Sequence, residues 1–205
     1  MDSVKEGVIM VKYPLGHSPR KSFMQRNINQ SVNYGSRGMS LEERLNNSNQ
    51  YYLTHNIGII HKKPTPIQVV KVDYPKRSAA KITEAYYRHA STTDYNGVYK
   101  GYYIDFEAKE TRNKTSFPLS NLPEHQRDHM MACIQQGGIA FLIISFTAHN
   151  EIYLIPYQLI NHYLIKNDKQ SISYEYIKKV GYVCPTSFNP MIDYLKALDN
   201  YIETI

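Results

Sequence analysis

The sequence has no tryptophan and only two cysteines, Cys133 and Cys184, among its 205 residues. Two cysteines cannot form a disulfide framework, and on their own they cannot make a thiolate zinc site. The longest hydrophobic run, Ile139–Phe146, has the length of a strand and falls far short of the roughly 20 residues that a membrane span needs. The apolar stretch Gly7–Val11 is also shorter than the ~7–15 residues at the core of a secretory signal. These absences disfavour secreted, membrane and zinc-finger classes, so the sequence predicts a soluble, cytoplasmic protein.

The positive charge is concentrated in two segments. The formal net charge is +6, of which residues 1–40 contribute +4 and residues 61–90 contribute +5, so the rest of the chain is net negative. Lys and Arg gain free energy by displacing counterions from phosphates, and basic segments on a slightly acidic body therefore suit a polyanion-binding surface. A solvated basic face would have the same composition, so charge alone leaves both interpretations open.

The length and the hydrophobic content of 42% fit one packed domain of ordinary size. Residues 1–39 show no sustained hydrophobic period, and we expect a flexible basic arm there. Residues 40–205 are expected to form a single α/β (α+β) domain. The spacing predicts helices over 41–56, 121–136, 156–165 and 190–202, and strands over 59–63, 67–72, 98–109, 139–146 and 152–155. The segment 81–90 is compatible with either a helix or a strand.

The predicted strand 98–109 carries the residues that suggest chemistry. Because strand side chains alternate, Asp105, Glu107 and Lys109 share one face. An Asn-Gly pair at 96–97 is typical of a hairpin turn, which would fold Asp94 back towards Glu107. Two converging carboxylates beside a lysine suit Mg²⁺, with Mn²⁺ as a substitute, and the ammonium can offset charge on a scissile phosphate. This is the Asp…Glu-x-Lys pattern of restriction-endonuclease-like nucleases, although Glu-x-Lys on a strand is more often a solvated face.

A resemblance to a known family rests on six segments: Tyr34–Glu43, Gly58–Pro66, Tyr74–Ala80, Ser91–Gly97, Tyr103–Thr111 and Asn113–Leu119, the last followed by His125-Gln126. In this order they closely resemble the RecU family, the Holliday-junction resolvases of low-GC Gram-positive bacteria. The resemblance covers about residues 30–200. It implies a restriction-endonuclease-like core, in which helices flank a mixed central sheet, and a protruding stalk at about residues 62–80.

The resemblance also implies a nuclease site. Asp94 and Glu107 match the family residues that hold Mg²⁺, and Lys109 matches the lysine that acts on the transition state. Glu42 matches an acidic residue that the first helix brings to the site, although a carboxylate there also stabilises the helix dipole.

Two further residues, Thr92 and Gln126, match positions near the metal in the family. Each can offer an oxygen to the ion or to its waters. Each also has a purely structural interpretation, as a turn hydroxyl for Thr92 and a helix-surface amide for Gln126.

The DNA contacts are expected in the basic segment. Lys62 and Arg77 match family DNA-binding positions, and their neighbours Lys63 and Lys76 are further candidates that could instead be solvated charges. The implied partner is branched DNA, a Holliday junction, on the nucleoid. The implied assembly is a homodimer, since cutting two like-oriented strands needs two sites related by a dyad. Recombinase and branch-migration proteins are further partners that the resemblance suggests.

Three histidines and Cys133 do not indicate a second site. His61, His89 and His125 form no pair with helical metal-ligand spacing, and we expect them to hydrogen-bond or to face DNA. Cys133 lies in the apolar stripe of the second predicted helix and is expected in the core.

The sequence therefore favours an Mg²⁺-dependent endodeoxyribonuclease that resolves Holliday junctions in homologous recombination and DNA repair. One alternative is a non-catalytic protein that binds or anneals branched DNA and modulates recombinase. Another is a restriction-type endonuclease. A pure binder would not require the acidic residues, and a restriction-type enzyme would differ in its substrate.

Overall fold

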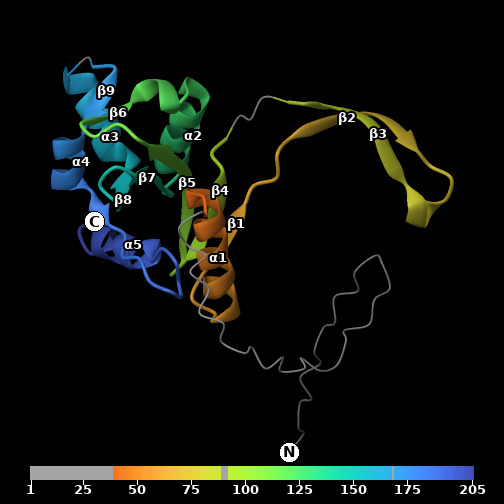
Figure 1. The fold of residues 1–205 in the computed structure, drawn as a ribbon, viewed down its shortest axis with the longest axis horizontal. Helices are drawn as coiled ribbons and strands as arrows, with labels where there is room; N and C mark the ends of the chain where they lie inside the picture. The colour runs from red at the N-terminus through yellow and green to blue at the C-terminus, as the bar shows by residue number, and fades with distance from the viewer. Residues whose placement is uncertain (1–38, 89–91, 168) are drawn as a thin grey trace, which may run out of the picture. The chain divides into compact units, whose positions relative to one another are not determined.

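The computed structural model describes residues 39–88, 92–167 and 169–205 (Figure 1). All of these lie in one unit, Arg37–Ile205. Nearly all of the arm predicted over 1–39 therefore lies outside the described residues. Within the described ranges, no helix has the length and apolar character needed to cross a membrane.

A six-stranded mixed sheet forms the centre of this unit, in the order β1-β4-β5-β7-β8-β10. The strands are β1 (Ile59–Lys62), β4 (Tyr95–Tyr99), β5 (Tyr102–Thr111), β7 (Ile139–Phe146), β8 (Glu151–Pro156) and β10 (Tyr182–Val183). Neighbours are antiparallel except for β5 and β7, which run parallel. A parallel pair needs a crossover connection, and helix α2 lies in it. The predicted mixed sheet is confirmed.

Helices cover both faces of this sheet. They are α1 (Leu41–Thr54), α2 (Glu124–Gln135), α3 (Tyr157–Asn167), α4 (Tyr174–Val180) and α5 (Tyr194–Ile202). One buried cluster joins α1 and α5 to the face that carries Phe106, and a second joins α2, α3 and α4 to the face that carries Leu142. Because β7 lies between the two clusters, all eight of its residues are buried. Helix α4 and the small sheet of β6 (Ser116–Pro118) and β9 (Ser171–Ser173) had no counterpart in the sequence prediction.

Local signals set the helix starts. Ser40 and Glu43 form the predicted capping box of α1: the Ser40 hydroxyl accepts from the Glu43 N–H at 3.2 Å, and the Glu43 carboxylate accepts from the Ser40 N–H at 2.9 Å. Helix α2 starts at Glu124, three residues later than predicted, because Leu119–Asn121 forms a separate 3-10 turn, η3. Helix α5 starts four residues later than predicted, since its N-cap is Asp193.

Strands β2 (Ile67–Asp73) and β3 (Lys81–Tyr87) pair with each other in a separate two-stranded sheet (Figure 1). Every residue of both strands is exposed. The 3-10 turn η2 (Arg77–Ala79) lies between them. Residues 81–87 of the segment left open over 81–90 thus form a strand, as their aromatic and β-branched residues favour, and 89–90 lie outside the described residues. The hairpin spans 67–87, so the stalk predicted over 62–80 overlaps only part of it.

The turn between β4 and β5 is not the predicted one. Lys100 and Gly101, with φ of 49° and 84°, connect the two strands, as expected of a two-residue hairpin turn. Gly97 instead lies inside β4, opposite Ile104. A Cβ on Gly97 would lie 2.1 Å from the backbone oxygen of Ile59 on β1, so this glycine allows two strands to approach closely. The strand predicted over 98–109 is therefore confirmed over 102–109 and wrong at 100–101, where the turn separates the end of β4 from β5.

Candidate active site

The strand β5 presents Glu107 and Lys109 on one face, as the period of two predicted. The Lys109 Nζ lies 2.8 Å from the Glu107 Oε1. Phe106, the residue before Glu107, points to the opposite face and anchors the strand in the core. Its ring stacks between those of Tyr95 and Phe141, with ring centroids 4.8 Å away on each side. This stack fixes the strand, so the carboxylate and the ammonium are held by a rigid element rather than by a loop.

Asp94 arrives next to Glu107 from the start of β4. The backbone N–H of Asp94 donates to the Glu107 Oε2 at 3.0 Å. The pairing of Tyr95 with Phe106 sets this register. The predicted convergence of the two carboxylates is therefore present, although the turn that produces it lies at Lys100 rather than at Asn96.

Burial gives Glu107 an unusual protonation behaviour. Its side chain is almost fully inaccessible, and this burial raises its pKa to about 7. The neighbouring Asp94 also raises the pKa, whereas the Lys109 ammonium lowers it. When Glu107 is deprotonated, its charge and that of Asp94 lie beside the ammonium of Lys109, so these three groups together carry a net negative charge.

A cavity of about 270 Å³ opens beside these residues, and Glu42 reaches it from the first turn of α1. It is lined by Ser40, Leu41, Glu42, Asp94, Tyr95, Ala108, Lys109 and Glu110. The structure thus brings Glu42, Asp94 and Lys109 to one cavity, as expected. The Glu42 carboxylate forms an ion pair with Lys62, and both side chains are exposed at this site.

Thr92 and Gln126 lie less directly at the site. The Thr92 hydroxyl donates to the backbone oxygen of Thr93 at 3.2 Å. This contact fits the structural interpretation of Thr92 as a turn hydroxyl. Gln126 is buried on α2, so it is not a helix-surface amide. Within the described residues, its Oε1 has no hydrogen-bond partner, and no hydrogen bond joins either side chain to Asp94 or Glu107.

These residues fit a hard divalent cation. Asp94 and Glu107 supply carboxylate oxygens, and the cation would restore the charge balance that burial of Glu107 disturbs. The buried Oε1 of Gln126 has no hydrogen-bond partner among the described residues, which is unfavourable for a polar atom. Oxygen donors of this kind suit Mg²⁺ or Mn²⁺ and not a thiolate-preferring ion.

The comparison with protein families agrees with this geometry. A family model described as "RecU: Recombination protein U" matches residues 36–200. The chain belongs to the RecU family.

Several relatives carry the name Holliday junction resolvase RecU. The protein of Leuconostoc mesenteroides is 52% identical over 201 residues, covering 95% of this chain and 98% of the relative. That of Lactobacillus helveticus is 49% identical over 206 residues, with 94% and 97% covered. That of Staphylococcus aureus strain COL is 55% identical over 175 residues, with 84% of each chain covered.

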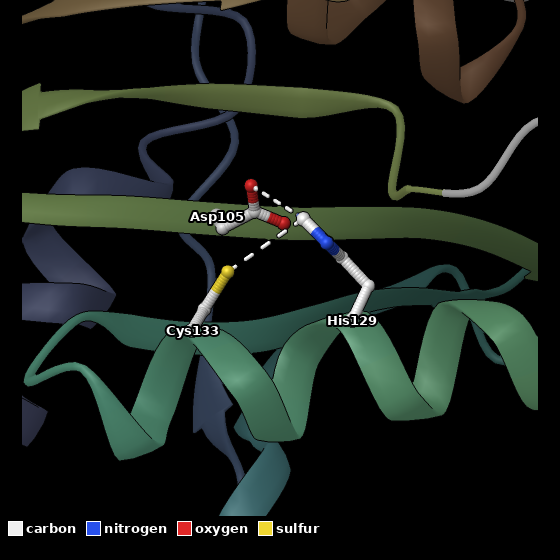
Figure 2. Close-up of side chains that lie close together, drawn as sticks. All are labelled: Asp105, His129 and Cys133. Carbon is white, nitrogen blue, oxygen red and sulfur yellow. Dashed lines mark hydrogen bonds and ion pairs between the residues drawn. The ribbon is translucent and has the colours of Figure 1, made fainter.

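A second polar cluster in this RecU chain had no counterpart in the sequence prediction. Asp105, on the same face of β5, lies fully buried beside His129 and Cys133 of α2, and Figure 2 shows the three side chains directed at one another. The His129 Nε2 is 3.3 Å from the Asp105 Oδ2 and 3.6 Å from the Cys133 Sγ. The spacing of four residues between His129 and Cys133 on one helix was the signal that could have revealed it.

Lys63 belongs to this cluster and not to the exposed basic surface. Its Nζ lies 2.7 Å from the Asp105 Oδ2, and only 18% of its side chain is exposed. The expectation that Lys63 contacts DNA therefore conflicts with its position, because a largely covered ammonium that is already paired with a buried carboxylate is not free to bind phosphate. The basic run at 62–63 is divided by strand alternation: Lys62 reaches Glu42, and Lys63 reaches Asp105.

The other expected DNA contacts lie on or near the hairpin. Lys76 is exposed just after β2, and Arg77 begins the turn η2 between the two strands. Lys62 ends β1, next to the cavity residue Glu42. These three positions run from the cavity to the hairpin turn.

Proposed function

We propose that this protein is a Holliday-junction resolvase, a metal-dependent endodeoxyribonuclease that nicks two like-oriented strands of a four-way junction in homologous recombination and DNA repair. The observation that carries the proposal is that Asp94 and Lys109 line one cavity and that both contact the buried Glu107 carboxylate. Support comes also from relatives of that name, which are about half identical to this chain over nearly its whole length.

The residues have distinct proposed roles. Asp94 and Glu107, with the oxygen of Gln126 or a water held by it, would hold Mg²⁺ or Mn²⁺. When bound, such an ion polarises a phosphate oxygen and lowers the pKa of a bound water. Lys109 keeps a positive charge beside Glu107, where it can offset charge that develops on the scissile phosphate. Glu42, at the same cavity, is held by Lys62 until phosphate competes for that ammonium.

The proposed assembly is a homodimer. Each chain would contribute the site of Asp94, Glu107 and Lys109. Two such sites related by a dyad can reach the two like-oriented strands of a four-way junction symmetrically. This part of the proposal rests on the substrate's geometry and predicts paired nicks at symmetric positions.

The test is cleavage of a synthetic mobile four-way junction, compared with a linear duplex of the same sequence, with and without Mg²⁺. We expect paired, symmetric nicks in the junction and little cutting of the duplex. A protein that binds the junction and never cuts it in any divalent cation would be the non-catalytic binder. Equal cutting of the linear duplex would indicate the restriction-type alternative.

The proposal predicts that Lys62→Ala and Arg77→Ala weaken junction binding. Each lost phosphate contact should reduce the slope of log affinity against log salt by about 1. The measurement is a junction titration at several salt concentrations in Ca²⁺. Lys100→Ala is the matched control, because Lys100 is an exposed lysine paired with Asp199 at the opposite end of β4. An unchanged slope in both variants would show that these cations are only a solvated face.

A further inference from the structure

The largely covered ammonium of Lys63 lies where the segment that carries the hairpin joins the central sheet. The chain leaves the central sheet after Lys62 and returns to it at Tyr95. There, the backbone N–H of Lys63 donates to the backbone oxygen of Asp94 at 2.7 Å. The Lys63 side chain continues inward and donates to the Thr93 hydroxyl at 2.9 Å and to the Asp105 carboxylate at 2.7 Å.

Asp105 is the acceptor at the centre of this cluster. It is fully buried, and a buried carboxylate is tolerated only when it is paired and hydrogen-bonded. Lys63 pairs with it, the Tyr103 hydroxyl donates to its Oδ2 at 2.9 Å, and the Thr93 hydroxyl donates to its Oδ1. His129 approaches from α2, one turn after Gln126 (Figure 2).

The cluster is centred on a lysine and not on a metal ion. The ligand atoms of Asp105, His129 and Cys133 lie within 4.8 Å of one another, which would suit a metal. However, the Lys63 Nζ already lies among them, 2.7 Å from Asp105 and 3.4 Å from the His129 Nε2. An ammonium and a divalent cation repel each other at such distances, so the lysine supplies the positive charge that Asp105 requires.

We infer that Lys63, Thr93 and Asp105 are positioning residues that hold Asp94 in place as a metal ligand. This inference rests on the proposed nuclease function. Three contacts define the backbone around Asp94: its carbonyl is held by Lys63, its N–H by Glu107, and the preceding side chain, Thr93, by Asp105.

The arrangement links β1, the start of β4 and β5 through side chains that never touch the proposed ion. Groups that orient the ligands of a metal commonly change its affinity 10–100-fold when they are removed, on the order of the effect expected here. Loss of the Thr93 hydroxyl should also lower the stability of the fold, because one oxygen of the buried Asp105 carboxylate loses its donor, so metal affinity is compared only between folded proteins.

The decisive comparison is Thr93→Val against Thr93→Ser. Valine keeps the shape and removes the hydroxyl that Lys63 and Asp105 share, whereas serine keeps it. We expect Thr93→Val to weaken Mn²⁺ binding by about tenfold, measured by calorimetry on the DNA-free protein, and Thr93→Ser to restore it. Junction affinity in chelator should equal that of the parent in both, because the basic residues are unchanged.

Cys133→Ser is the matched control, since the Cys133 thiol lies 3.6 Å from the His129 Nε2 and, among the described residues, forms no hydrogen bond with Lys63, Thr93 or Asp105. It should bind Mn²⁺ as the parent does. The double variant Lys63→Met/Asp105→Asn removes both partners of the ion pair together. If Thr93→Val does not fold, the Mn²⁺ affinity of this double variant is the test. Parent-like Mn²⁺ affinity in a folded Thr93→Val or double variant would overturn the positioning role. A parent protein that binds no Mn²⁺, or an Asp94→Asn variant that binds it as tightly as the parent, would instead refute the proposed metal site itself.

Discussion

Asp94→Asn and Glu107→Gln should each abolish cleavage of a four-way junction while leaving junction binding intact. Both changes keep the size of the side chain and remove one charge from the pair that would hold the cation. Losing that cation removes several kcal/mol of transition-state stabilisation, on the order of a thousandfold or more in rate. Binding depends mainly on cations elsewhere, and removing a negative charge near the phosphates reduces repulsion. Single-turnover cleavage and a junction titration measure the two effects separately.

The structure adds a stability readout for Glu107→Gln. The pKa of Glu107 is raised to about 7 in the folded protein, above its ordinary value of 4.5. Above pH 7 the metal-free fold therefore carries an unfavourable buried charge, which glutamine lacks. We expect the metal-free variant to unfold at an equal or higher temperature than the parent at alkaline pH, so loss of activity would not be loss of fold.

Glu124→Gln is a suitable control for both variants. Glu124 is exposed in the first turn of α2, so its neutralisation changes the net charge equally without touching the site. It should cut at the parent's rate. Cutting at near-parent rate by Asp94→Asn or Glu107→Gln would place the active site elsewhere.

The alternation along β5 was enough to predict the central part of the site from sequence. Glu107 and Lys109 share a face because side chains alternate along a strand, and this alternation does not depend on which strands lie beside β5. The approach of Asp94 was also predicted, but through the wrong turn. Asn-Gly is a strong local signal for a turn, but in this fold Gly97 lies inside a strand. A glycine is required there because the backbone of β1 approaches closely, and the residues next to Gly97 in the sequence do not reveal that long-range contact.

The cluster around Asp105 could not be predicted in the same way. Lys63 stands 42 residues from Asp105 and 30 from Thr93, and in the sequence it looks like one more member of a basic run. Only the pairing of β1 with β4, and of β4 with β5, brings Lys63 to Asp105 while its neighbour Lys62 reaches Glu42. Long-range contacts between charged residues leave no periodic signal, so the structure was needed to separate Lys63 from Lys62.

Withdrawal of divalent cations should reduce junction cleavage to background, and Mg²⁺ or Mn²⁺ should restore it. Ca²⁺ should support junction binding with little cleavage, because it accepts looser oxygen coordination than Mg²⁺. The physical reason is the negative charge of the deprotonated site, where the Glu107 carboxylate is paired with the ammonium of Lys109 and the Asp94 carboxylate adds a second negative charge. The measurement is cleavage in excess chelator, followed by titration of each ion. Full activity in chelator would contradict the metal mechanism.

The need for a cation beside the Glu107 carboxylate also predicts how metal affinity depends on pH. Proton and cation compete for Glu107, whose pKa in the metal-free fold is about 7, so Mn²⁺ affinity should rise as pH increases through that value.

The stability of the metal-free protein should change in the opposite direction. Because the folded state holds a proton that the unfolded chain releases above its ordinary pKa, the contribution of Glu107 to stability is fully present at low pH and is lost as pH rises through about 7. Added Mn²⁺ should recover that stability above pH 7, since the bound cation replaces the proton as the charge partner of Glu107. Thermal unfolding with and without Mn²⁺ at about pH 6 and about pH 8 tests both signs in one experiment.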